Sequence, residues 1–372
     1  LVVDPKAEYR QLLNVPGVAG KVLVVGVGKP FPFLWNPLEV PGGVSAGLWL
    51  KAFADVFTRA YGLSDPSRRI LFDCLRGLYG RYGVVEGRGV FPTLRELEVE
   101  VGRFRAESPN EASSKRAVEN RLHILNTGLL GDALNVPQGY GLKDFGERIV
   151  VLELDRVPSM RDQAFVVEML LGALWEALHH APSSVGGLRQ LVVVEEAHRY
   201  LSEARPPSRR GERSLLELAV AEGRRYGFGF VILDQLPGLL SRYVLENCAT
   251  KVVHRLESWE QVRLLMDAMA VRLDTVLAKI ALHSPPGYAV MKTPWLEAVR
   301  TPSLVRFPLL QRALPSDEDL ATRGVFLSRE TAVAEERRRY ISLLLKRGDL
   351  SPEVRVGLQG REAQASAAHR EG

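Results

Sequence analysis

Short runs of apolar, mostly β-branched residues recur along the chain, and turn residues bound each of them. Most of these runs are apolar at every position, which is typical of central strands in a parallel sheet that helices cover on both faces. Helical patterns lie between them, and Phe165, Met169 and Leu170 follow the spacing of a buried helix face. This alternation predicts a doubly wound α/β sheet domain. The predicted strands are residues 1–3, 22–25, 149–154, 191–194, 228–233 and 251–255.

One long interval interrupts the alternation. Between about residues 45 and 146 the periodicity is helical, and Gly, Pro and Asp turns separate the successive helices. We therefore expect a helical subdomain, residues 45–146, inserted between a first part of the sheet domain, residues 1–44, and its remainder, residues 147–308. Residues 309–372 are expected to form a charged helix and a polar tail. The predicted helices are residues 46–61, 67–82, 93–105, 111–126, 164–178 and 329–346.

The composition excludes several classes of protein. With 46% hydrophobic and 25% charged residues, the 372-residue chain is neither disordered nor fibrous. No apolar run approaches the roughly 18 residues of a membrane span, so no membrane partner is predicted. Cys74 and Cys248 lie far apart with no second ligand at metal-site spacing, which argues against a disulfide framework or a zinc site and favours a cytoplasmic location. His179 and His180 have no partner ligand nearby in sequence and are interpreted as a helix C-terminus.

The sharpest local signal is an apolar strand that ends in two acids, Glu195 and Glu196. Ligands bind at the carboxyl ends of strands in open α/β sheets. Two successive carboxylates at such an end can hold Mg²⁺ through water and polarise an attacking water during nucleoside triphosphate hydrolysis. The alternative is that both acids only begin a helix, where they suit the positive end of its dipole.

A second signal follows about forty residues later, where a helix ends at Arg224 and Arg225, a glycine turn follows, and a strand leads to Gln235. A glutamine at a strand tip can contact a γ-phosphate and its attacking water, and either arginine can stabilise charge in the transition state, in its own subunit or across an interface. The alternatives are a charge pair at a helix C-terminus and a turn residue before Pro237.

A third segment, Asp4-Pro5-Lys6-Ala7-Glu8-Tyr9, follows the first strand. Together the three segments resemble the HerA/FtsK-like superfamily of P-loop ATPases, most closely its HerA branch. Asp4 to Tyr9 matches that family's D-P-K/H-G-E-Y pattern except that Ala7 replaces the usual Gly. Val194 to His198 matches its magnesium-site strand, and Gly223 to Gln235 resembles its G-R-K-x-G…Q segment, with Leu236 where an Arg often follows.

This resemblance implies a RecA-like fold, ATP and Mg²⁺ as cofactors, and a motor that translocates or unwinds double-stranded DNA as a homo-hexamer. It also implies a NurA-type nuclease partner and nucleotide contacts at Asp4 and Glu8. Glu195 is then the Mg²⁺ residue, Glu196 the catalytic base, Gln235 the γ-phosphate sensor, and Arg224, with Arg225 second, the transition-state cation. Two alternatives are a conjugation-type or antiphage motor with the same site, and a non-hydrolysing DNA-binding or assembly subunit.

The phosphate-binding sequence G-x-x-x-x-G-K-[ST] occurs nowhere in the chain. The two Gly-Lys pairs, Gly20-Lys21 and Gly28-Lys29, lack both the first glycine and the hydroxyl residue and are interpreted as turns. The family places its phosphate loop just before the Asp4-Pro5 strand, so we expect that loop upstream of Leu1. Without its backbone N–H cradle, this chain is expected to bind ATP weakly or not at all.

Overall fold

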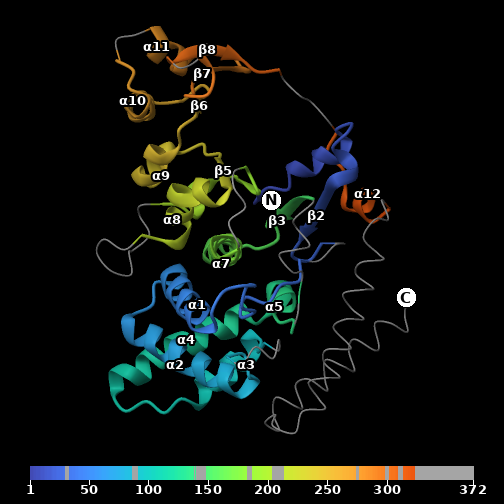
Figure 1. Cartoon of the computed structure of the whole chain (residues 1–372), viewed down its shortest axis with the longest axis vertical. Helices are drawn as coiled ribbons and strands as arrows, with labels where there is room; N and C mark the ends of the chain where they lie inside the picture. The colour runs from blue at the N-terminus through green and yellow to red at the C-terminus, as the bar shows by residue number, and fades with distance from the viewer. Residues whose placement is uncertain are drawn as a thin grey trace.

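The computed structural model describes residues 1–29, 33–85, 91–137, 139, 148–181, 187–202, 213–273, 276–297, 301–308 and 313–322. Five parallel strands form its central sheet in the order β2-β3-β1-β4-β5 (Figure 1). The predicted parallel α/β sheet is therefore confirmed for the first five apolar runs. The strands are β1 (Val2–Asp4), β2 (Val22–Gly26), β3 (Ile149–Glu153), β4 (Gln190–Val194) and β5 (Phe228–Ile232).

The two faces of this sheet are covered unequally. One face packs on α7 (Met160–His180), in which Phe165 is fully buried. The other face is covered over β1, β2 and β3 by Tyr9, Leu12 and Leu320. Over β4 and β5 it is open, because Leu191 and Val231 are each 41% exposed. The prediction of burial on both faces is therefore wrong for β4 and β5, where no described element covers the apolar side chains.

The helices of the insertion follow β2 as expected (Figure 1). The side chain of Ser45 accepts a hydrogen bond from Leu48 N at the start of the first of them, and Gly62 ends it in the left-handed conformation, φ 65°. The whole set shares one hydrophobic core with α7 and the sheet, in which Phe53 and Phe57 meet Phe165 edge to face. The helices are α1 (Ala46–Tyr61), α2 (Asp65–Tyr82), α3 (Leu94–Arg103), α4 (Pro109–Leu125) and α5 (Gly128–Leu134).

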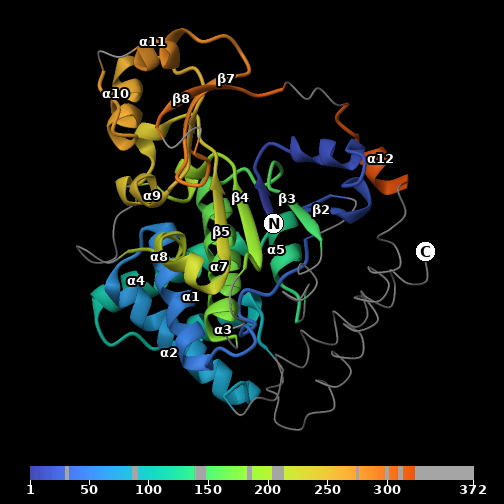
Figure 2. The ribbon, with the colours of Figure 1, turned by 45° about the horizontal axis from the view of Figure 1, so that its top comes forward.

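The sixth predicted strand does not join the central sheet. Instead β6 (Lys251–Val253) pairs antiparallel with β7 (Tyr288–Lys292), which pairs antiparallel with β8 (Ser303–Arg306). This small sheet packs on α10 (Trp259–Ala268) and α11 (Val276–His283) and has its own core around Val262 and Met266 (Figure 2). The sequence of β6 favours a strand, but a short apolar run carries no information about its pairing partner.

A cluster of six charges fastens the C-terminal part of the described chain to the sheet. Arg10 donates from Nε and Nη2 to the fully buried Glu153, at 2.8 and 2.5 Å, and lies 3.0 Å from Asp317 of α12 (Asp317–Thr322). Lys29 lies 3.3 Å from Glu153, and Arg156 pairs with Asp317; the sixth charge is Asp155, 2.8 Å from Lys29. The helix α12 was not predicted, because a segment of six residues is too short to be stable without the tertiary contacts of Asp317.

Two further helices flank the last strand of the central sheet, and two predicted segments remain. The helices α8 (Leu215–Glu222) and α9 (Arg242–Asn247) flank β5 in sequence. The predicted helix 329–346 and the predicted polar tail lie outside the described residues. Among the described helices, none is both long enough and apolar enough to cross a membrane.

Candidate functional site

The carboxyl ends of β1, β4 and β5 bring three of the predicted segments to one edge of the sheet. These strands are neighbours and parallel, so Asp4 at the end of β1 and Glu195 and Gln235 after β4 and β5 lie at strand ends that are side by side. Figure 2 shows β4 beside β5. The contacts of Glu195 N with Val3 O, 3.3 Å, and of Leu233 N with Val194 O, 2.9 Å, continue this arrangement past the strand ends. The carboxyl ends of the strands therefore bring these three side chains to one end of the sheet, as the sequence predicted.

The carboxylate of Glu195 lies among other acidic side chains, and one of its oxygens has no hydrogen-bond partner among the described residues. Its Oε2 is buried and makes no hydrogen bond to any described residue. Burial raises the pKa of Glu195, and the negative charges of Asp4 and Glu8 raise it further. A buried carboxylate oxygen without a partner, surrounded by like charge, is the environment that a divalent cation stabilises. Glu195 therefore fits Mg²⁺, either directly or through a water molecule.

Glu196 is held from two sides. It is 7% exposed and adopts the left-handed conformation, φ 49°, which is rare for a residue with a side chain. Its Oε1 forms an ion pair with Lys6 Nζ, and its Oε2 lies 3.6 Å from Nδ1 of His198. The hydrogen bond to Glu196 raises the pKa of Lys6, so this lysine stays charged. The strained backbone and the fixed carboxylate are typical of a residue whose position matters for chemistry.

Asp234 forms hydrogen bonds that connect the segment after β4 to the segment after β5. Its Oδ2 accepts hydrogen bonds from His198 N, 2.6 Å, and lies 2.9 Å from His198 Nδ1. Its Oδ1 accepts from Leu236 N, 2.6 Å, which closes the turn around Gln235. Asp234 thus connects the segment of Gln235 to the histidine beside Glu196.

Asp4 shapes the turn that carries Lys6. It is fully buried, and its two oxygens accept from the backbone N–H groups of Lys6, 3.0 Å, and Tyr9, 2.8 Å. Burial raises the pKa of Asp4, although these backbone hydrogen bonds oppose the rise. Ala7 has φ 58°. It occupies the position at which the D-P-K/H-G-E-Y motif has Gly. Glu8 is exposed beside this turn, so Asp4 positions the loop while Glu8 is accessible for binding.

The predicted sensor and the predicted arginines lie at opposite ends of the parallel strands. Gln235 follows the carboxyl end of β5, and the arginines precede its amino end. Gln235 is exposed after β5 and makes no hydrogen bond to a described residue, whereas Arg224 and Arg225 precede β5 on the 3-10 turn Gly223–Tyr226. Five strand residues at about 3.3 Å each separate the two ends by about 16 Å. Arg224 is exposed, with its guanidinium 5.2 Å from the ring centre of Trp295. Within one chain, neither arginine lies at the edge that carries Glu195 and Glu196.

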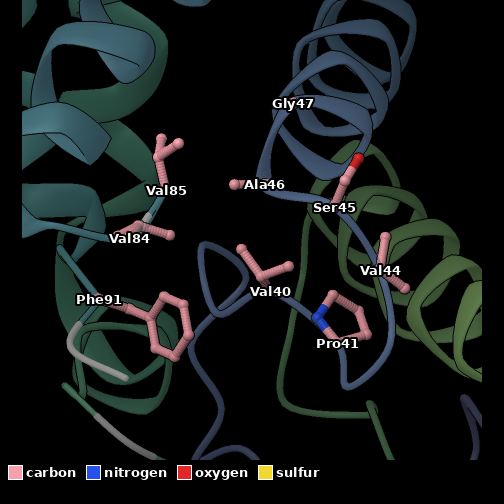
Figure 3. A pocket seen from close by; sticks show the side chains of 9 residues that line it. All are labelled: Val40, Pro41, Val44, Ser45, Ala46, Gly47, Val84, Val85 and Phe91. Carbon is pink, nitrogen blue, oxygen red and sulfur yellow. The ribbon is translucent and has the colours of Figure 1, made fainter. Parts of the chain in front are cut away.

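An apolar pocket lies elsewhere, where the segment before α1 meets the end of α2 (Figure 3). None of the predicted site residues lines it. The adjacent Glu39 has a buried Oε2 without a hydrogen-bond partner among the described residues, and burial raises the pKa of this carboxyl to about 7. The pocket is lined by Val40, Pro41, Val44, Ser45, Ala46, Gly47, Val84, Val85 and Phe91.

The comparison with solved structures decides the fold. VirB4 of Thermoanaerobacter pseudethanolicus superposes with a TM-score of 0.63 at 16% identity, over 83% of this chain and 81% of that chain. The plasmid coupling protein TrwB in complex with ADP and Mg²⁺ superposes with a TM-score of 0.58 at 12% identity, over 85% of this chain and 80% of that chain. The chain has the fold of VirB4 and TrwB. The predicted RecA-like P-loop NTPase fold is therefore confirmed.

At 16% identity or less, this similarity shows the fold alone and does not select the HerA branch that the sequence motifs resemble. No family model matches the sequence, and no curated protein matches it.

The sequence analysis assigned no role to Lys6, His198 or Asp234. All three lie inside the segments that it singled out, but their pairing depends on which strands are neighbours. The signal that could have found them is the shared strand edge, since each residue lies within four positions of a predicted strand end.

Proposed function

We propose that the chain is the motor part of an ATP-driven translocase or helicase for double-stranded DNA, of the HerA type, which works as a homo-hexameric ring. The observation that carries the proposal is the convergence of Glu195, Glu196 and the Gln235 turn at the carboxyl edge of β1, β4 and β5. Structural similarity to TrwB solved with ADP and Mg²⁺ supports a nucleotide at this edge.

In this proposal each residue has one task. Glu195, with its unpartnered buried oxygen, holds Mg²⁺ through water, which neutralises charge on the phosphates. Glu196 accepts the proton of the attacking water, and the ion pair with Lys6 holds its carboxylate in place. Gln235 orients that water. Glu8 contacts the metal's water shell, while Asp4 acts by shaping the turn beneath it.

Arg224 and Arg225 act in the neighbouring subunit. They are exposed at the far edge of the sheet, so they reach a catalytic centre only across a head-to-tail interface that closes into a ring. The phosphate cradle is assigned to no residue of this sequence, because the sequence contains no Gly-rich loop that ends in Lys-Ser/Thr.

The test is DNA-stimulated ATP hydrolysis by the full gene product, wild type against Glu196→Gln. Removal of a general base should lower kcat by about 10²-fold or more, with little change in KM. Unchanged turnover would refute the assignment of Glu196, and no turnover in the wild type would favour the non-hydrolysing assembly subunit.

A second test addresses the arginines. Arg224→Ala should lower turnover far more than nucleotide affinity, and Arg225→Ala should have the smaller effect. Equal loss of turnover and of nucleotide affinity in Arg224→Ala would contradict its role across an interface.

A conjugation-type motor is the second candidate, and the similarity to VirB4 and to the conjugative coupling protein TrwB favours it. The two candidates differ in partner. A HerA-type motor should co-purify with, and be stimulated by, a NurA-type nuclease encoded nearby, whereas a conjugation-type or antiphage motor should not.

A further inference from the structure

Three potential metal ligands lie at the C-terminal end of α7. This end of the helix is near the amino ends of the strands, opposite the proposed catalytic residues at their carboxyl ends. One ligand atom each of Glu176, His179 and His180 lies within 4.8 Å of the other two. The interpretation of the two histidines as a helix C-terminus without a partner ligand left out Glu176, which precedes them by three and four positions. Residues three and four apart on a helix face the same side, which brings Glu176 to both histidines.

The spacing of two of these atoms already suits a bound ion. Glu176 Oε2 and His180 Nε2 lie 3.3 Å apart. Two ligands at about 2.0 to 2.1 Å from a tetrahedral zinc ion are separated by about 3.4 Å. The pair therefore needs little rearrangement to chelate an ion, and a ligand atom of His179 lies within 4.8 Å of both.

The burial of Glu176 supports the same conclusion. It is 7% exposed, and among the described residues its ion-pair partner is His180. A buried carboxylate requires a compensating positive charge, which a divalent ion shared with two imidazoles supplies. Its neighbours are the exposed histidine side chains, so an ion can enter from solvent.

His179 is held in place by aromatic rings. Its ring centre lies 4.5 Å from that of Tyr226, 5.3 Å from that of Trp175 and 5.1 Å from that of His180. These contacts restrict the rotamers of the imidazole and keep it beside the other two ligands. Less conformational entropy is then lost when it coordinates an ion.

We propose that Glu176, His179 and His180 bind one divalent transition-metal ion of the zinc class, with water in the fourth position. Two imidazole nitrogens and one carboxylate oxygen suit zinc, cobalt or nickel, and they disfavour Mg²⁺ and Ca²⁺, which prefer all-oxygen ligands. The ion fixes the end of α7 and, through the contact of His179 with Tyr226, the turn that carries Arg224 and Arg225.

The test is calorimetric titration of the untagged 372-residue chain with ZnCl₂ after chelator treatment, and it does not depend on ATP hydrolysis. We expect one ion per chain at this site, and a dissociation constant raised by about tenfold or more in His180→Ala and in the isosteric Glu176→Gln. Co²⁺ should give the intense visible absorption of a four-coordinate site in the wild type and lose it in both variants.

The matched control is His123→Ala. His123 Nδ1 lies 2.9 Å from Glu98, so it forms a histidine–carboxylate pair that has no third ligand among the residues that the structure describes. Its removal should leave zinc affinity unchanged, and zinc should raise the unfolding temperature of the wild type and of this control but not of His180→Ala. Absence of zinc binding in the wild type, or equal affinity in wild type and His180→Ala, would overturn the proposal.

Discussion

Glu39 provides a direct test of the electrostatics of this fold, because its carboxyl is buried without a counter-charge among the described residues. Burial raises its pKa from 4.5 to about 7, and its Oε2 has no hydrogen-bond partner among the described residues. The folded chain therefore holds the Glu39 proton more tightly than the unfolded chain does. Between these two pKa values the folded state binds more protons, so its stability falls as the pH rises from about 4.5 to about 7.

The magnitude follows from the size of the pKa shift. About 2.5 pKa units at 1.36 kcal/mol each amount to about 3 kcal/mol of stability lost once Glu39 is ionised. Glu39→Gln keeps the shape of the side chain and removes the charge. The variant should therefore be more stable than the wild type by about 2 to 3 kcal/mol at pH 8 and by less than about 1 kcal/mol at pH 5.

The assay is urea unfolding of both proteins at pH 5 and pH 8, with the free energy of unfolding extrapolated to water. The control is Glu297→Gln, which removes an exposed carboxylate and should change stability by no more than about 0.5 kcal/mol at either pH. An equal difference between wild type and Glu39→Gln at both pH values would refute the reasoning. A less stable variant at pH 8 would do the same.

Three further perturbations test the site and its support. Ala7→Gly should stabilise the chain by up to about 1 kcal/mol in urea unfolding, because relief of a φ of 58° outweighs the greater entropy of unfolded Gly; a loss above about 1 kcal/mol would contradict this. Lys6→Ala should destabilise the wild type more than it destabilises Glu196→Gln, with a coupling energy of about 0.5 to 3 kcal/mol in a double-mutant cycle, and additive effects would show that the ion pair is not formed. Glu153→Gln should cost about 3 to 5 kcal/mol, because it leaves the buried Arg10 guanidinium without its bidentate partner, and a loss below about 1 kcal/mol would show that other acids replace that partner.

The sequence predicted the elements of the core because their local signals agree with the fold. The strands that begin at Val22 and Ile149 each start with four consecutive apolar residues, and α1 has a Ser cap and a terminal Gly that mark both of its ends. The short helix α12 has a local cap, in which Ser316 and Asp319 bond each other's backbone N–H, but it is only six residues long and its ion pairs to Asp317 come from distant segments.

The candidate site was predicted in part for the same reason. The paired acids Glu195 and Glu196, and Gln235 after the next strand, are visible as residue types at strand ends. The ion pair of Lys6 with Glu196 and the contact of Asp234 with His198 cannot be found in the sequence, because they join segments more than thirty residues apart.

The sequence by itself determined that this chain forms a parallel α/β sheet with inserted helices and that two acids follow one of its strands. Hydrophobic periodicity and caps act within a few residues, so a linear reading can find them. Only the tertiary structure decided three features. The strand β6 pairs in a separate sheet, Arg224 lies at the end of the strands opposite Glu195, and Glu176 lies close to two histidines. Those outcomes depend on strand order and on the packing of distant segments, which no local pattern encodes.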